Sequence, residues 1–273
     1  MNRKRRVPWQ PTKIIEVLDH AVDTATHPVI VKTDQGHGYF KAIENPAGAS
    51  ALAREFIGTS LADWLDLPTF RYCLFDFDGK LDIVLSDGTR VNQGVGFMTK
   101  EEPGDNWDKT TDMLDDLVNK DDITRLVILD TWLRNIDRCF QHNGKFHTNS
   151  NNVFIAMTPK NEYILKAMDF THAFLGNLDQ TMDKSSNIND EEIYGCYPAF
   201  SQFLNKEIAV KTCEKLKKIQ DKDIRPLFVA IPTIWNIDHG TKESWMRFIL
   251  GRANFVANTF LWLSRLDTSY LRF

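Results

Sequence analysis

Two apolar segments that each end at an aspartate decide how this sequence is interpreted: ITRLVILDTWLRNIDR at residues 123–138 and YILKAMDF at residues 163–170. Between Asp137 and Asp169 lie a loop rich in asparagine and the strand-like run Val153–Met157. The order acid, asparagine, acid suits phosphoryl transfer from a metal-bound nucleotide, in which one acid faces the acceptor hydroxyl and the other two groups hold the metal. We therefore expect the two carboxylates to converge on one divalent cation.

An asparagine in this loop is expected to be a metal ligand, because an amide oxygen can complete a magnesium shell. We favour Asn152, which directly precedes the strand-like run Val153–Met157 and is held by that regular element. Asn143, Asn149 and Asn151 compete for the same role, and each of them can instead be an ordinary turn residue.

Other polar residues near the two aspartates are expected to bind metal or phosphate, or to support the fold. Asp169 directly follows the strand-like run Tyr163–Met168, a position from which a carboxylate is well placed to bind metal. Arg138 either neutralises transferred phosphate or pairs with its neighbour Asp137. Asp130 lies two turns earlier on the same helix and is interpreted as structural. His172 is expected to donate to a phosphate or to make a structural hydrogen bond.

A glycine turn followed by a lysine predicts a phosphate-binding element near the N-terminus. Gly36 and Gly38 flank His37 in this turn, and Lys41 lies in the strand that follows. The turn is not a Walker A loop, because no Gly-Lys-Ser/Thr sequence comes after it. Glu55, in the next helix, is spaced so that it can pair with Lys41 and orient it toward nucleotide phosphates. We predict that both glycines, the lysine and the glutamate bind the nucleotide.

The composition is that of an ordinary globular protein and excludes several classes. Of the 273 residues, 42% are apolar and 26% are charged, and the net charge of −4 gives no global attraction for nucleic acid or acidic lipid. No apolar run is long enough to span a membrane, and no apolar leader follows the basic cluster Arg3–Arg6. The four cysteines show no paired spacing, which predicts reduced thiols in the cytoplasm.

The first hundred residues predict a β-rich region with one helix. The expected elements are a hairpin, a helix, and two further strands joined at the tight turn Asp78-Gly79: His27–Val31, Tyr39–Ile43, Ser50–Leu65, Phe70–Phe77 and Leu81–Leu85. The stretch Gly94–Asn106 fits neither the strand nor the helix period and is interpreted as a connector that contains the boundary between two lobes.

The remainder predicts one more hairpin and a largely helical tail. The hairpin joins Val153–Met157 to Tyr163–Met168. The expected helices are residues 107–120, 123–134, 199–204, 206–219, 223–229 and 242–266. We therefore expect an α+β fold with two lobes, a β-rich N-terminal lobe at residues 1–98 and a mostly helical C-terminal lobe at residues 99–273.

Several of these stretches resemble the HipA-like kinases, bacterial serine/threonine kinases whose fold is related to that of phosphatidylinositol kinases. The catalytic core of that family is similar to DTWLRNIDR at 130–138, NVFI at 152–155 and MDF at 168–170. Its nucleotide-lysine strand and following helix are similar to GYFK at 38–41, AREFI at 53–57 and LADWLDLP at 61–68. The resemblance implies a bilobal, protein-kinase-like fold.

The resemblance also implies roles by position: Asp137 as the catalytic base, Asn152 and Asp169 as Mg²⁺ ligands, Lys41 as the contact to ATP phosphates, and Glu55 as the residue that orients this lysine. The sequence departs from the family pattern in two places. Cys139 stands where a histidine often follows the Asp-Arg pair. Residues 141–151 lie between the base and the favoured asparagine, which keeps Asn143 as an alternative metal ligand.

Together these observations predict a kinase that uses ATP and Mg²⁺ to phosphorylate a Ser or Thr hydroxyl of a protein substrate of unknown identity. One alternative is a pseudokinase that binds nucleotide or acts as a scaffold without turnover. A second alternative is a lipid kinase of the phosphoinositide type. The resemblance adds an antitoxin-like partner to the candidate partners, whereas no nucleic-acid or membrane partner is expected.

Overall fold

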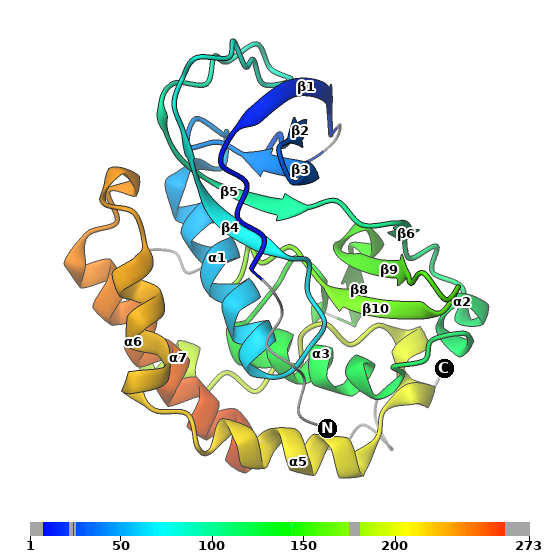
Figure 1. Ribbon diagram of the computed structural model, residues 1–273. Coiled ribbons are helices and arrows are strands. Elements are labelled where there is room, and N and C mark those ends of the chain that lie inside the picture. Colours follow the sequence, from blue (N-terminus) through cyan, green and yellow to red (C-terminus); the bar gives the residue numbers. More distant parts are fainter. Residues whose placement is uncertain (1–7, 22–23, 25, 143, 175–180, 260–273) are drawn as a thin grey trace. The chain divides into compact units, whose positions relative to one another are not determined.

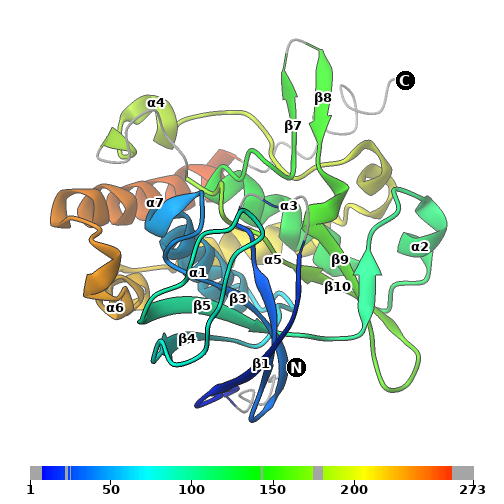
Figure 2. The ribbon, with the colours of Figure 1, turned by 90° about the horizontal axis from the view of Figure 1, so that it is seen from above.

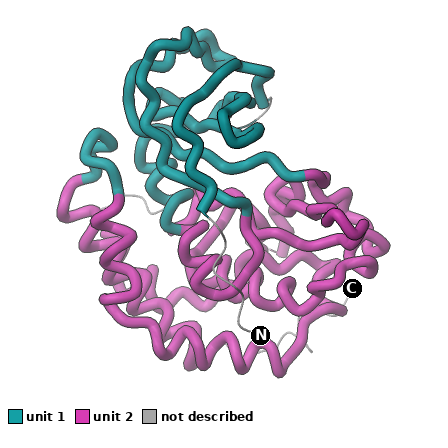
Figure 3. Tube along the Cα trace, in the orientation of Figure 1, with its two compact units in different colours: residues 1–57, 70–102, 231–237 teal, residues 58–69, 103–230, 238–273 magenta. Residues whose placement is uncertain are grey.

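The computed structural model describes residues 8–21, 24, 26–142, 144–174 and 181–259. Contacts divide the chain into two compact units that alternate along the sequence (Figure 3). Unit 1 comprises residues 1–57, 70–102 and 231–237, and unit 2 comprises residues 58–69, 103–230 and 238–273. The predicted lobe boundary between residues 98 and 99 stays a prediction. In the structure, each unit is built from three separate stretches of the chain.

Unit 1 is built on an antiparallel sheet with the strand order β1-β2-β3-β5-β4 (Figure 1). Its strands are β1 (Ile14–His20), β2 (Val29–Thr33), β3 (Gly36–Lys41), β4 (Tyr72–Phe77) and β5 (Gly94–Lys100). Apolar side chains from one face of this sheet, including Phe40, Phe75 and Met98, form a core together with Trp9 and Ile83. Burying this face supplies the main driving force for the unit.

The glycine turn of unit 1 confirms the first predicted hairpin, with a tighter connection than expected. Strands β2 and β3 pair in a register that places Thr33 opposite Gly36. Gly36 has a φ of +100°, which favours glycine. A Cβ atom at Gly38 would lie 2.7 Å from the Trp9 ring and 2.8 Å from the carbonyl oxygen of Thr99. Both glycines are therefore required by the fold.

Helix α1 (Gly48–Trp64) confirms the helix expected after the hairpin, and its residues up to 57 belong to unit 1. Two other expectations for this region are wrong. Residues 81–85 form no strand, because β4 pairs with β5 and the intervening residues fold over the sheet. The supposed connector Gly94–Asn106 contains β5, a central strand, because its glycines allow close packing against β3.

A short strap returns the chain to unit 1 late in the sequence. Residues 231–237 lie between helices α6 (Asp221–Ala230) and α7 (His239–Thr259) of unit 2 and contain the 3₁₀ turn η4 (Thr233–Trp235). Trp235 is buried, and its indole Nε1 donates a hydrogen bond to the carbonyl oxygen of Val95 at 2.6 Å. The strap is therefore anchored on strand β5.

Unit 2 combines two small sheets with a set of helices. The strands are β6 (Gly104–Asn106), β7 (Cys139–His142), β8 (Lys145–Thr148), β9 (Val153–Met157) and β10 (Tyr163–Ala167). They form a sheet of order β10-β9-β6 and a separate β7-β8 hairpin, which projects from the rest of the unit in Figure 2. The helices are α2 (Thr111–Asp115), α3 (Asp121–Leu133), α4 (Ser185–Ile188), α5 (Lys206–Leu216), α6 and α7, with 3₁₀ turns η1 (Ser150–Asn152) and η3 (Pro198–Phe203).

Helix α3 is the centre of unit 2. It is buried along almost its whole length and packs against α5 and α7. The indole of Trp132 donates a hydrogen bond to the carbonyl oxygen of Ile249 in α7 at 2.8 Å. A helix that is buried on nearly every side lies in the interior of a domain. Its C-terminal end therefore offers a rigid base for the residues that follow.

The structure confirms the β9–β10 hairpin, α3 and the helical tail, and corrects two expectations for unit 2. Residues 107–120 contain only the short helix α2, and the asparagine-rich loop contains the β7–β8 hairpin. The end of the last predicted helix, residues 260–266, lies outside the described residues. Among the described residues, every helix is too short or too polar to cross a membrane.

We predict that Gly96→Ala destabilises unit 1 by about 1–3 kcal/mol, because overpacking has a cost of this size. A Cβ atom at Gly96 would overlap the Phe40 ring and lie 2.6 Å from the carbonyl oxygen of Lys41. The matched control on the same strand is Gly94→Ala, where the nearest atom, in Ile234, would be at 3.5 Å. Urea unfolding compares the two variants, and equal losses would contradict the packing argument.

Candidate active site

The segment that carries Asp137 begins at a sharp turn after helix α3. Arg134 caps the helix with a φ of +48°, a left-handed conformation that ends regular helical hydrogen bonding. The backbone N–H of Asn135 then donates to the carbonyl oxygen of Asp130 at 2.9 Å. The chain therefore changes direction at Arg134, while Asn135 stays hydrogen-bonded to the last turn of the helix.

A fully buried ion pair fixes the segment to the helix. Arg138 Nε donates to Asp130 Oδ2 at 2.6 Å, and neither side chain is exposed to solvent. The expectation that Arg138 pairs with Asp137 or meets phosphate is therefore wrong, because the guanidinium points back into unit 2. Burial raises the pKa of the Asp130 carboxyl, while Arg138 and Asn135 counteract this shift.

The same groups bind the segment that contains Asp169. Arg138 Nη2 donates to the carbonyl oxygen of Met168 at 2.5 Å, and Asn135 Nδ2 donates to the carbonyl oxygen of Asp169 at 3.2 Å. Asn135 Nδ2 also donates to Asp130 Oδ1 at 3.1 Å. Asp137 and Asp169 are 32 residues apart in the sequence, and the segments that carry them are joined through one buried polar cluster.

Asp169 itself has a left-handed backbone with a φ of +54°. Its Oδ1 accepts a hydrogen bond from the backbone N–H of Thr171 at 3.2 Å, which holds the carboxylate at the start of a turn. The next residue, Phe170, is buried against Gly58, where any Cβ atom would overlap the phenyl ring. The glycine in α1 thus allows the aromatic residue after Asp169 to pack closely.

Asp137 lies among three polar side chains. Its Oδ2 accepts hydrogen bonds from Asn152 Nδ2 at 2.7 Å and from Asn149 Nδ2 at 3.2 Å. His172 Nδ1 lies 3.6 Å from the same oxygen. The carboxylate remains about one-third exposed, with a relative side-chain accessibility of 35%. It is thus held by the protein and still accessible to a reactant.

The turn η1 positions both asparagines. The backbone N–H of Asn149 donates to the carbonyl oxygen of Arg138 at 2.9 Å, and that of Asn152 donates to the carbonyl oxygen of Asn149 at 3.1 Å. Tyr197 Oη also donates to the carbonyl oxygen of Asn149 at 2.7 Å. Burial raises the pKa of Tyr197, so the phenol stays protonated and able to donate.

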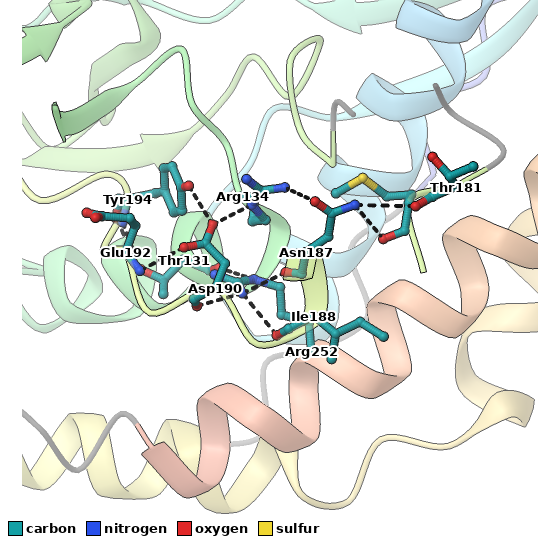
Figure 4. A network of polar contacts seen from close by, with 10 residues as sticks. Thr131, Arg134, Thr181, Asn187, Ile188, Asp190, Glu192, Tyr194 and Arg252 are labelled. Carbon is teal, nitrogen blue, oxygen red and sulfur yellow. Dashed lines mark hydrogen bonds and ion pairs between the residues drawn. The ribbon is translucent and has the colours of Figure 1, made fainter. Parts of the chain in front are cut away.

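A second polar network supports the end of α3 (Figure 4). Arg252 of α7 donates at 2.8 to 3.1 Å to four backbone carbonyl oxygens, those of Thr131, Asn187, Ile188 and Asp190. The Asp190 carboxylate accepts hydrogen bonds from Arg134 Nε at 2.6 Å and from the Tyr194 hydroxyl at 2.7 Å. Burial lowers the pKa of Arg252 to about 10. These contacts hold the helix-capping arginine in place.

In unit 1, the predicted lysine and glutamate form an ion pair. Lys41 Nζ lies 3.4 Å from Glu55 Oε2, and the two side chains are 13% and 5% exposed. Lys41 ends strand β3, and Glu55 lies on helix α1. The pair connects the glycine hairpin to the helix through two largely desolvated charges, which favours a fixed orientation of the lysine.

Within each unit the structure pairs two of the residues that the sequence singles out, Lys41 with Glu55 in unit 1 and Asn152 with Asp137 in unit 2. The backbone carbonyl oxygen of Asp169 is bound by Asn135, which belongs to the buried cluster around Asp130. Asn151 is exposed, and Asn143 lies outside the described residues. The sequence offers Asn149 only as an alternative to Asn152 for the role of metal ligand. Its spacing of three residues from Asn152 is the signal that both side chains can face one side of a tight turn.

Comparison with known proteins identifies the family. The family model described as "HipA-like kinase" matches residues 14–260. The chain belongs to the HipA-like kinase family. The structure of this HipA-like kinase is also similar to the crystal structure of CtkA, a proinflammatory kinase of Helicobacter pylori. That match has a TM-score of 0.59, 11% sequence identity, and coverage of 98% of this chain and 99% of that chain. No curated protein matches.

The likeness to CtkA supports the fold, and the expected α+β fold with a sheet-rich N-terminal part and a helical C-terminal part is confirmed. Family membership supports phosphotransfer as the general activity of this HipA-like kinase. The roles of individual residues in that activity stay predictions.

We predict that Asp130→Asn destabilises the HipA-like kinase by about 3–5 kcal/mol, because it leaves the buried guanidinium of Arg138 without its counter-charge. The control is Asp221→Asn, which removes an exposed ion pair with Arg225 and should cost much less. Denaturant unfolding with two spectroscopic probes measures both variants. A loss at Asp130 no larger than that at Asp221 would show that the buried pair is unimportant.

Proposed function

We propose that this HipA-like kinase uses ATP and Mg²⁺ to transfer the γ-phosphoryl group to a Ser or Thr hydroxyl of a protein. The observation that carries the proposal is the 2.7 Å hydrogen bond from Asn152 Nδ2 to Asp137 Oδ2. It joins an amide suited to bind metal to a carboxylate suited to orient a hydroxyl. In kinases the metal binds phosphate oxygens of the nucleotide, while the carboxylate contacts the hydroxyl oxygen that attacks the γ-phosphorus.

Asp137 is the proposed base. Its carboxylate is held on one oxygen by amide donors and is partly exposed, so an acceptor hydroxyl can approach it. Phosphoryl transfer has a loose transition state, and catalysis consists mainly of positioning and of stabilising charge. The main task of Asp137 is therefore to orient the hydroxyl and accept its proton as the new P–O bond forms.

Asn152 and Asp169 are the proposed Mg²⁺ ligands, and their chemistry fits this ion. Because Asn152 directs its amide nitrogen to Asp137, its Oδ1 is the atom left to bind a cation. Asp169 adds a carboxylate, and Mg²⁺ typically takes one or two carboxylates and completes its shell with phosphate and water oxygens. When bound, the metal would neutralise charge on the transferred phosphates. The described residues contain no ready-made group of three or more His, Cys, Asp or Glu side chains for a metal.

Lys41 is the proposed phosphate contact, and Glu55 is the residue that orients it. Both charges are largely desolvated, which strengthens their interaction relative to an exposed pair. Gly36 and Gly38 shape the hairpin that precedes the lysine, and we propose that this hairpin contributes to nucleotide binding. The positive φ of Gly36 and the close packing at Gly38 also explain, without any ligand, why glycine occupies these two positions.

The protein acceptor and the cellular setting extend the proposal. A Ser or Thr acceptor follows from the HipA-like sequence pattern, and an antitoxin-like protein is the partner that this pattern suggests. We propose a cytoplasmic location, which agrees with the four cysteines being free thiols. Neither a nucleic acid nor a membrane is part of the proposal.

We predict that Asp137→Asn and Asp169→Asn each lower phosphoryl transfer by about 100- to 10,000-fold, the range expected for loss of a proton-accepting or charge-stabilising group. The assay uses radiolabelled ATP with Mg²⁺ and measures label on casein and on the protein itself. Asp115→Asn, at an exposed position on α2, is the control and should retain wild-type transfer.

Wild-type-like transfer in either aspartate variant would refute the assignment of that residue. If the wild-type protein binds ATP by calorimetry but labels no protein, the pseudokinase alternative replaces the proposal. Label on phosphoinositide vesicles without label on protein would favour the lipid kinase alternative.

We also predict that Lys41→Met raises KM for ATP by about tenfold or more, because a charge-assisted contact to phosphate is lost. Glu55→Gln should produce a smaller change in the same direction, since the lysine remains but loses its orienting partner. The control is Lys32→Met, an exposed residue on β2. Steady-state kinetics against ATP concentration measure all three. An unchanged KM for Lys41→Met would separate this lysine from nucleotide binding.

A further inference from the structure

The two oxygens of the Asp137 carboxylate have different surroundings. Oδ2 accepts hydrogen bonds from Asn152 and Asn149, at 2.7 and 3.2 Å, and faces His172 Nδ1 at 3.6 Å. Oδ1 accepts no hydrogen bond from the part of the chain that the structure describes. The described residues thus bind this carboxylate through one of its two oxygens.

This asymmetry assigns different tasks to the two oxygens. A carboxylate oxygen has about two lone-pair sites, and two amide donors occupy those of Oδ2. A hydroxyl that approaches Asp137 therefore finds its acceptor at Oδ1. A half-turn of the carboxylate exchanges two equivalent oxygens and restores the same arrangement, whereas smaller rotations break both amide hydrogen bonds. One oxygen therefore always faces the amides, and the other faces away from them.

We propose that Asn149 and His172 are positioning residues that hold Oδ2 of Asp137 and so present Oδ1 to the acceptor hydroxyl. The inference rests on the proposed function. In the reaction, the hydroxyl oxygen bonds to the γ-phosphorus while the bond from that phosphorus to the bridging oxygen breaks and its electron pair stays on ADP. The hydroxyl proton moves to Asp137 Oδ1.

Asn149 is suited to this task because its backbone is fixed independently of its side chain. Its N–H and carbonyl oxygen make hydrogen bonds to Arg138, Asn152 and Tyr197. Truncating the side chain would leave these backbone contacts intact. A loss of activity in such a variant can therefore be attributed to the amide group.

His172 approaches from the segment that follows Asp169. Its Nδ1 is buried and has no hydrogen-bond partner among the described residues, and the carboxylate oxygen of Asp137 is the acceptor that faces it. A lone pair on Nδ1 would repel Oδ2, whereas an N–H would be attracted to it. The contact therefore favours the tautomer in which Nδ1 carries a proton.

The kinetic test compares truncated and conservative variants. Asn149→Ala and His172→Ala should lower kcat by about 10- to 100-fold with KM for ATP unchanged, because misplacement of a reacting group has an effect of this size. His172→Asn should retain more activity than His172→Gln, since the asparagine amide reaches the position of Nδ1 and the glutamine amide that of Nε2. Transfer from ATP with Mg²⁺ to casein provides the rates.

Two matched controls probe exposed residues of the same types. Asn254→Ala removes an exposed asparagine of α7, and His239→Ala removes an exposed histidine at the start of the same helix. Both should retain wild-type kcat. If Asn149→Ala instead raises the Mg²⁺ concentration required and leaves kcat at saturation unchanged, Asn149 is a metal ligand and the inference fails. Unchanged kcat in His172→Ala also overturns it.

A spectroscopic test needs no catalytic activity. Nitrogen-15 NMR of the histidine rings should show a proton on Nδ1 of His172 in the wild-type protein, and a shift toward the common Nε2–H tautomer in Asp137→Ala. An Nε2–H tautomer in the wild-type protein would contradict the contact. A wild-type protein that transfers no phosphate refutes the proposed function, whereas active wild type with unaffected positioning variants refutes only this inference.

Discussion

The buried ion pair between Asp130 and Arg138 is the constraint on which the rest of the site depends. Removing two charges from water is costly, and such a pair adds little net stability compared with apolar side chains of similar size. Its effect is to specify one arrangement, because each charge must keep its partner. The Asp130 carboxylate accepts hydrogen bonds from Arg138 and Asn135, and Arg138 also donates to the carbonyl oxygen of Met168. Gly195 completes the packing, since a Cβ atom there would overlap the Asp130 carboxylate.

Sequence patterns predicted the elements whose character is local and missed those defined by their partners. The apolar periodicity of α3 and the alternation of β9 and β10 are visible within each segment. Strand β5, in contrast, contains two glycines that resemble a connector, and its strand character comes from pairing with β3 and β4. The β7–β8 hairpin is short and polar, so neither its length nor its pattern separates it from a loop.

The same distinction applies to the candidate site. Asp137, Asn152 and Asp169 could be singled out because each follows or precedes a recognisable element. The partner of Arg138 could not be inferred, since adjacency to Asp137 suggested the wrong acid and only the turn at Arg134 brings Asp130 within reach. The support from Arg252 is more remote still, because it comes from a helix more than 110 residues further along the chain. Contacts of that kind depend on how α3 and α7 pack, which no local pattern records.

The geometry of unit 2 shows how a site of this kind is prepared before any ligand binds. Arg134 and Asp169 both adopt left-handed backbones, and each such residue costs about 1–2 kcal/mol when it is not glycine. These conformations persist because the side chain of Arg134 is bound by Asp190 and the backbone of Asp169 is bound by Asn135. The strain at the two turns is therefore offset by buried polar contacts behind them. Polar groups that are already oriented need no reorganisation during a reaction, and this is what the proposed catalysis by positioning and electrostatics requires.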